Sequence, residues 1–265
     1  MTFYVITHKH FNYQSLPIGY TPLLVGANKN QNPDSFITDN TGDNISNKNY
    51  SFCELTGLYW MWKNTKDKNI GLAHYRRYFS KYTSFNILYL TTIIKGHSQP
   101  VSVSQLDTWL KDGTDWIVAT PQIGGVGSLW EQFDHFHHIK DLEITRNIIK
   151  ETFPEYISSF DKVMKHNNQA SFYNMFYTRR EEMDKYCEWL FEILFQAEKQ
   201  VDISSYDQYQ QRLYGFLGER LLNVWLDHRQ PKIKQLVEYN SDSMARIDAA
   251  RLLKHNLITR NVNLS

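Results

Sequence analysis

The stretch NIGLAHYRRYF, residues 69–79, decides our expectation of the fold. Its first five residues are mostly apolar, which is typical of a strand buried on both faces of a sheet. His74, Arg76 and Arg77 follow directly. A guanidinium keeps its charge at all working pH values and can bind a phosphate through paired hydrogen bonds. The stretch therefore predicts a buried strand that delivers cations to a phosphate-bearing ligand. The alternative is a structural ion pair, for example with Glu54.

Short apolar runs and helical periodicities on either side of this stretch predict an α/β protein. Strands are expected at residues 2–7, 22–27, 69–73 and 115–120, with helices near 50–64 and 103–111. Further helices are expected near 129–151, 154–166, 180–199, 205–213 and 217–228, with an extended piece at 171–178. Strands that alternate with helices early in the chain favour an open, Rossmann-like, mostly parallel sheet flanked by helices, followed by a helical C-terminal part.

Ligands of such sheets bind outside the carboxyl ends of the strands. Polar or small residues follow three predicted strands directly: Thr7 and His8, Gly26 and Ala27, and His74 to Arg77. We expect these three segments to converge on one cleft. The long polar loop 28–49 offers Asp39 and Asn44, whose short side chains suit the hydroxyls of a sugar or nucleoside. The alternative is a polar loop that only caps the next helix.

The segment DHFHHIKDL, residues 134–142, contains three histidines but lacks an HxxxH pair or an adjoining carboxylate pattern. A metal site is therefore not expected there. His137 and Asp141 lie four residues apart, so on a helix they share a face and can form a hydrogen bond. They either bind ligand hydroxyls or form a surface His–Asp pair.

The segment GFLGERLLNVWL, residues 215–226, predicts a turn that delivers Glu219 to the first turn of an apolar helix. The helix dipole stabilises a carboxylate at that position, and the group could act as a general base towards a hydroxyl. The alternative is a buried ion pair between Glu219 and either Arg220 or Arg76.

Composition excludes several classes of protein. The net charge of +1 argues against a nucleic-acid binder that relies on phosphate attraction. The two cysteines lack the spacing of a zinc site and are compatible with the cytoplasm. The N-terminus does not resemble a signal peptide, and no apolar run reaches the roughly 18 residues of a membrane span. An aromatic content of 15% suits a site that stacks on rings and binds hydroxyls, or alternatively a tyrosine-rich core.

The C-terminal stretch is more basic than the rest of the chain. Residues 229–265 carry seven lysines and arginines against three acids, a net charge of +4. We therefore expect a main domain at residues 1–228 and a basic extension at 229–265. The extension could bring a cytoplasmic protein to the membrane surface, or it could be a solvated tail or an oligomer contact.

Six segments together form a more specific pattern: DNISNKNYSFCELTGLYWMWKN, IGLAHYRRYF, HHIKDL, FYNMF, YCEWLFEIL and YGFLGERLLNVWL. This combination resembles a family of bacterial capsular and exopolysaccharide glycosyltransferases, long catalogued only as a domain of unknown function. The resemblance extends from the first predicted strand to about residue 228. It implies a GT-A-type fold, a UDP-sugar donor and a glycan acceptor, with inverting transfer from UDP-galactofuranose as the leading candidate reaction.

The resemblance also implies roles for the residues. Many nucleotide-sugar transferases carry an acidic, metal-binding pair where this chain has His74 to Arg77, so we expect that no divalent metal or tightly bound cofactor is required. Glu219 is the expected base, with Asp141 in reserve, although related turns usually have an acid where this chain has Arg220. The donor is assigned to Thr7, His8, Gly26, Ala27, Asp39, Asn44, His74, Arg76 and Arg77, and the acceptor to His137, Asn174 and Arg220.

Two other functions remain open at this point. A non-catalytic carbohydrate- or nucleotide-binding module would have the same aromatic content. A nucleotide-sugar-modifying enzyme would need a GxGxxG or Tyr-x-x-x-Lys motif after the first strands, and neither is evident in a suitable place. The sequence does not determine the oligomeric state.

Overall fold

The computed structural model describes residues 1–262, and the side chains of residues 1–257. Within them, a mixed sheet of nine strands has the order β10-β6-β9-β4-β1-β2-β3, with β5 pairing β4 and β11 pairing β5. The strands are β1 (Thr2–Thr7), β2 (Tyr20–Leu24), β3 (Ile37–Thr38), β4 (Asn69–His74), β5 (Arg77–Phe79), β6 (Trp116–Ala119), β9 (Phe176–Arg179), β10 (Ile233–Leu236) and β11 (Glu238–Asn240). A separate two-stranded sheet joins β7 (Gln122–Ile123) and β8 (Gln169–Ala170).

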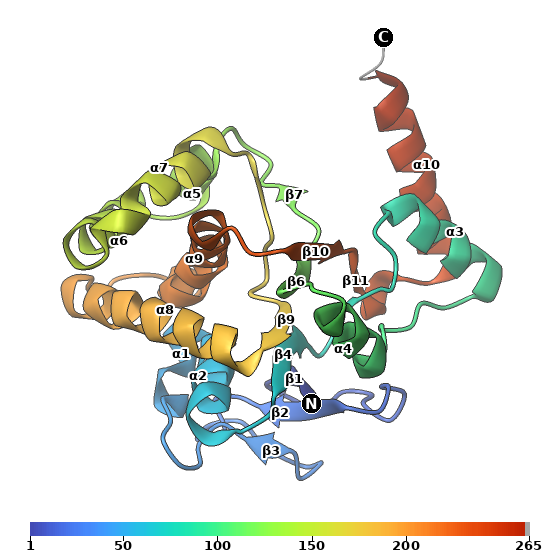
Figure 1. Ribbon diagram of the computed structural model, residues 1–265, viewed down its shortest axis with the longest axis horizontal. Coiled ribbons are helices and arrows are strands. Elements are labelled where there is room, and N and C mark those ends of the chain that lie inside the picture. Colours follow the sequence, from blue (N-terminus) through green and yellow to red (C-terminus); the bar gives the residue numbers. More distant parts are fainter. Residues whose placement is uncertain (263–265) are drawn as a thin grey trace.

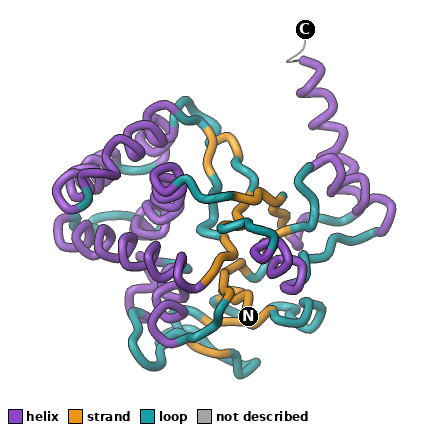
Figure 2. The backbone as a smooth tube through the Cα atoms, in the orientation of Figure 1, coloured by secondary structure: helices purple, strands orange, loops and turns teal. Residues whose placement is uncertain are grey.

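Helices cover both faces of this sheet, as Figures 1 and 2 show. They are α1 (Asn49–Phe52), α2 (Leu55–Asn64), α3 (Phe85–Lys95), α4 (Val103–Lys111), α5 (Leu129–Phe136), α6 (Ile139–Thr152), α7 (Ile157–His166), α8 (Arg180–Gln200), α9 (Leu213–Arg229) and α10 (Arg246–Val262). The main run of strands is parallel except for β9, which lies antiparallel to both β4 and β6. The predicted α/β class with a mostly parallel sheet is confirmed.

Strand β1 shows why the central strands are almost continuously apolar. Successive side chains of a strand point to opposite faces. Phe3 and Val5 join the core that includes α4, while Tyr4 and Ile6 join the core that includes α8 and α9. Because both faces are buried, no polar side of the strand is needed, and the alternation typical of a half-exposed strand is absent.

Two of the predicted helices are broken in the structure. The helix expected at 50–64 is divided at Cys53, whose φ of 51° lies in the left-handed region that a helix cannot include. The helix expected at 129–151 is divided at His137, whose backbone is extended (φ −140°, ψ −171°). The apolar periodicity continues across both breaks, so it did not reveal them.

Other boundaries also differ from expectation. Helix α3 and the short strand β5 were not predicted, and the helix expected at 205–213 is reduced to a single 3₁₀ turn, Gln210–Arg212. Helix α9 begins at Leu213 rather than at 217. Its two glycines therefore lie inside the helix, where they are buried and tightly packed against α1 and α2.

The chain after α9 returns to the sheet. The expected boundary at residue 228 falls just before the end of α9, and β10 then pairs parallel to β6. Strand β11 pairs with β5, and α10 packs along α3. The segment predicted as a basic extension thus contributes two strands to the main sheet.

Candidate functional site

A large cavity of about 980 Å³ lies at the carboxyl ends of β1 and β4. Its wall includes eight residues that the sequence nominated: Thr7, His8, His74, Arg76, Arg77, His137, Glu219 and Arg220. The structure therefore brings together the strand ends and the helix α9 from opposite halves of the chain. Gly26, Ala27, Asp39, Asn44, Asp141 and Asn174 do not line it.

The two adjacent arginines differ in how they are held. Arg77 donates to a carboxylate oxygen of buried Glu238 at 3.1 Å, and its guanidinium lies 4.0 Å from the centre of the Tyr173 ring. Arg76 is exposed, and its guanidinium makes no ion pair or hydrogen bond within the described side chains; it lies 5.6 Å from the Tyr75 ring. Arg76 is thus the cation that is free to bind an anionic ligand.

A second available cation, Arg212, was missed by sequence reasoning. It lines the cavity just before α9, and its Nε donates to Cys53 Sγ at 3.3 Å. His8 and Arg76 both lie beside the Tyr75 ring, at 5.3 and 5.6 Å from its centre. Burial lowers the pKa of His8, and the positive charges of Lys9, Arg76 and Arg212 lower it further. A lone arginine ahead of an apolar helix carries no motif, which is why the pattern did not single it out.

His74 binds the protein backbone. Its Nε2 lies 2.6 Å from the carbonyl oxygen of Tyr173, and since a carbonyl only accepts, Nε2 carries the proton. Burial lowers the pKa of His74, which favours the neutral ring. Its direct role is therefore to hold residue 173 in place.

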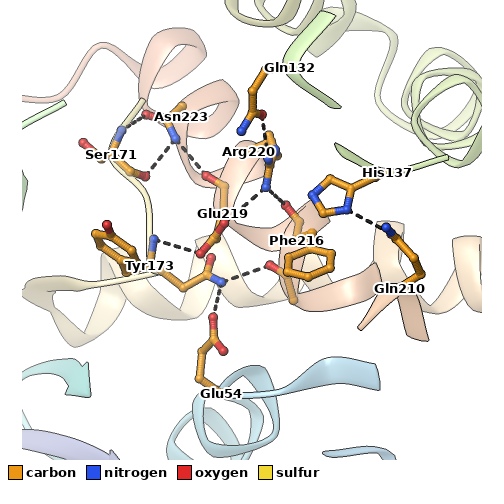
Figure 3. Close-up of polar contacts among 12 residues, drawn as sticks. Glu54, Gln132, His137, Ser171, Tyr173, Gln210, Phe216, Glu219, Arg220 and Asn223 are labelled. Carbon is orange, nitrogen blue, oxygen red and sulfur yellow. Dashed lines mark hydrogen bonds and ion pairs between the residues drawn. The ribbon is translucent and has the colours of Figure 1, made fainter. Parts of the chain in front are cut away.

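Glu219 presents its carboxylate to the cavity (Figure 3). One oxygen accepts from the Tyr173 backbone N–H and the other from Arg220, both at 3.1 Å. Burial raises the pKa of Glu219, while the Arg220 charge opposes that rise. The predicted place in the first helical turn is wrong: α9 begins at Leu213, so Glu219 lies in the second turn and the helix dipole contributes little.

Arg220 is held mainly by the protein. Its side chain is 3% exposed and donates to the Phe216 carbonyl at 3.0 Å and to Gln132 at 2.7 Å, besides Glu219. Its Nε has no hydrogen-bond partner within the described residues. This geometry makes Arg220 a fixed positive charge behind Glu219.

A second carboxylate, Glu54, faces the same cavity and was not among the predicted site residues. Its oxygen accepts from Asn174 Nδ2 at 2.7 Å, and burial raises its pKa. Tyr173 and Asn174 both have positive φ, 74° and 52°, a conformation that costs of order 1–3 kcal/mol per residue. This strained pair places one donor on each carboxylate, which explains why the structure maintains it.

Asp39 lies behind the cavity wall rather than in it. It is fully buried, and its carboxylate accepts from the backbone N–H groups of Gly26 and Ala27 and from the hydroxyls of Ser46 and Thr56, at 2.5 to 3.1 Å. With four protein donors, the carboxylate has no need of a ligand. Asp39 can affect the donor site only by shaping the loop that follows β2.

Asn44 is also satisfied locally. Its amide donates to the Gly42 carbonyl at 2.9 Å, and its oxygen accepts from the Ser46 N–H at 3.2 Å. These bonds close a turn within the loop, and the side chain does not reach the cavity.

The expected contact between His137 and Asp141 is wrong because the helix break separates them. His137 instead contacts Gln210 at 3.0 Å and stacks on Phe216, and burial lowers its pKa to about 4. Asp141 is 2% exposed, and both its oxygens accept from the Tyr206 hydroxyl. Asp141 therefore lies outside the cavity that Glu219 faces.

Within the described residues, no group of three or more His, Cys, Asp or Glu side chains is arranged to hold a metal ion. In the same part of the chain, every helix is too short or too polar to cross a membrane.

Comparison with known proteins supports the fold. A family model described as "Domain of unknown function (DUF4422)" matches residues 2–230. The apo structure of the WbbM bifunctional glycosyltransferase is similar at 26% sequence identity and a TM-score of 0.78. The similarity covers 90% of this chain and 45% of the WbbM chain, so the present chain spans less than half of that protein. No curated protein sequence matches the chain.

Proposed function

We propose that this chain, which belongs to the DUF4422 family, is a glycosyltransferase that takes its sugar from a UDP-sugar and passes it to a glycan. The observation that carries the proposal is one cavity lined both by the available cations Arg76 and Arg212 and by two half-buried carboxylates, Glu54 and Glu219. Similarity to a bifunctional glycosyltransferase supports the class of reaction. Galactofuranose, transferred with inversion in capsule, exopolysaccharide or O-antigen synthesis, is the sugar that the sequence pattern favours.

The cations that line the cavity suit the donor diphosphate. Arg76 and Arg212 are available to it, since neither forms an ion pair with an acid among the described side chains. Fixed positive charge there stabilises the negative charge that grows on the leaving UDP. The uracil and ribose then extend along the cavity wall formed by Thr7 and Asn30.

The carboxylates that line the cavity suit the acceptor. Glu219 removes the proton of the acceptor hydroxyl as that oxygen bonds to the anomeric carbon and the carbon–phosphate oxygen bond breaks. The proton stays on Glu219, and UDP leaves with the electron pair. A glutamate pKa raised by burial lies closer to neutral pH, where a general base is most effective. Glu54 accepts a hydrogen bond from a second hydroxyl of the acceptor, and His137 lines the same cavity.

The proposal is tested by measuring UDP release from UDP-galactofuranose and other UDP-sugars in the presence of bacterial polysaccharide fragments. Glu219→Gln should lower turnover by at least about 10²-fold, the lower range of general base catalysis, and leave UDP affinity nearly unchanged. Near-normal turnover of this variant would exclude Glu219 as the base. A non-catalytic binding module would instead show ligand-induced thermal stabilisation without UDP release.

Metal dependence is tested separately. Because Arg76 and Arg212 already supply positive charge, we propose that UDP binding persists in EDTA. Loss of UDP affinity in EDTA that Mn²⁺ restores would contradict this part of the mechanism. His74, which lines the cavity, would then be the first ligand to test by substitution.

A further inference from the structure

The outward face of α3 carries a row of apolar side chains. Ile87, Leu90 and Ile94 follow the i, i+3, i+7 spacing of one helix face and are 49, 51 and 69% exposed. The opposite face of α3 packs into the core through Leu88 and Tyr89. Single exposed apolar residues are common, but an aligned row of three on one short helix marks a contact surface.

A small basic cavity of about 190 Å³ adjoins this row. Helix α3 contributes Thr91 and Lys95 to its wall, and the neighbouring loops contribute Lys81 and His97. No aspartate or glutamate lines it. Thr91 and Lys95 continue the helical ridge that starts at Ile87, so the cavity lies directly beside the apolar row. Its size and charge suit a phosphate group.

Helix α10 adds positive charge beside α3. The two helices pack together and stand away from the helices of the other sheet face (Figure 1). Helix α3 and the part of α10 whose side chains are described carry one acid, Asp248, against four cations: Lys95, Arg246, Arg251 and Lys254. The described side chains of these two helices therefore carry a net charge of +3.

We propose that α3 binds an anionic membrane surface, with Ile87, Leu90 and Ile94 in the lipid interface and a phospholipid phosphate in the basic cavity. Apolar insertion and attraction to anionic lipid are the two interactions that hold interfacial helices on membranes. A symmetric contact between two copies would bring like charges together, which is unfavourable. A site for free phosphate would leave the apolar row unexplained. The inference does not depend on the proposed enzymatic activity.

The test is co-sedimentation of the full chain with vesicles of phosphatidylcholine alone and with 30% phosphatidylglycerol. Binding is expected only to the anionic vesicles and should fall as salt is raised. The triple substitution Ile87→Ser, Leu90→Ser and Ile94→Ser should weaken it by at least about tenfold, because three apolar side chains leave the interface. Lys81→Gln with Lys95→Gln should weaken it by a similar factor and flatten the salt dependence.

A matched control replaces three exposed isoleucines elsewhere, Ile18, Ile37 and Ile233, which are 98, 43 and 40% exposed. That variant should bind the anionic vesicles as the unaltered chain does. Thermal stabilisation by UDP, measured on every variant, separates loss of membrane binding from loss of the fold or of the proposed nucleotide site.

Four outcomes would overturn the proposal. The unaltered chain could fail to bind the anionic vesicles, or the α3 triple variant could bind as well as the control variant. A concentration-dependent dimer, seen by light scattering and lost in the α3 triple variant, would identify a second copy as the occupant. Full displacement by millimolar inorganic phosphate, with no effect of the apolar substitutions, would identify a free-phosphate site.

Discussion

The segments that follow β2 and β4 are both rich in polar residues, yet they use their hydrogen bonds in opposite ways. After β2, the loop turns its polar groups inward onto Asp39, which accepts four hydrogen bonds while fully buried. After β4, Arg76 remains exposed without a hydrogen bond or ion pair among the described side chains. Polar composition at a strand end therefore marks two different things, a self-supporting loop and a surface that is ready for a ligand.

Substitution of Asp39, the buried acceptor in the loop after β2, should have the largest effect on stability. Asp39→Ala leaves four donors without an acceptor, and each buried unsatisfied donor costs about 1–3 kcal/mol. We expect the free energy of unfolding to fall by about 3 kcal/mol or more in urea denaturation. Asp43→Ala, in the exposed part of the same loop, is the control and should cost less than about 1 kcal/mol. Equal, small losses for both would show that the Asp39 network is not what holds the loop.

Turnover, which depends on Glu219 in the cavity, should respond to pH. Burial raises the pKa of Glu219, and the base works only when ionised, so turnover should fall as pH drops through a value above the ordinary glutamate pKa of about 4.3. Two pH units below that midpoint, turnover should be about 10²-fold lower. A pH–rate profile measures this. The residual activity of Glu219→Gln should lack that acidic limb, and a limb that persists unchanged would assign it to another group such as Glu54.

The two adjacent arginines should give opposite signatures. Arg76→Ala should weaken UDP binding about tenfold, since a hydrogen bond to a charged group contributes about 1.5–3 kcal/mol, and leave the melting temperature unchanged. Arg77→Ala should lower the melting temperature, because it leaves Glu238 buried without its partner. Calorimetric titration with UDP and thermal unfolding separate the two. If Arg77→Ala weakened UDP binding more than Arg76→Ala did, Arg77 rather than Arg76 would be the arginine that binds the ligand.

The smallest effect is expected at Asn44, in the exposed part of the loop after β2. Asn44→Ala removes two local hydrogen bonds in a partly exposed turn and should change stability by about 0.5 kcal/mol, with UDP affinity unaltered. A tenfold loss of UDP affinity in the same titration would mean that the loop opens to meet the donor.

The sequence predicted the β1 and β4 strands and the convergence of Thr7, His8 and His74, because strand direction alone brings those ends together. It did not reveal Glu54, Arg212 or the strained pair Tyr173–Asn174. Glu54 follows the break at Cys53, Arg212 ends the reduced helix before α9, and the positive φ angles of Tyr173 and Asn174 bring one donor to each of the two carboxylates. All three features depend on tertiary packing, which local periodicity does not encode.

Strand β9 has a consequence for synthesis of the chain. It lies between β4 and β6, so residues 176–179 separate two strands that are translated much earlier. Until that strand emerges, β4 and β6 each have an open edge with unpaired backbone groups. Folding must therefore wait for contacts over about 100 residues of chain, which slows it and exposes a partly made sheet to aggregation. A fragment ending near residue 120 should be poorly soluble for this reason alone.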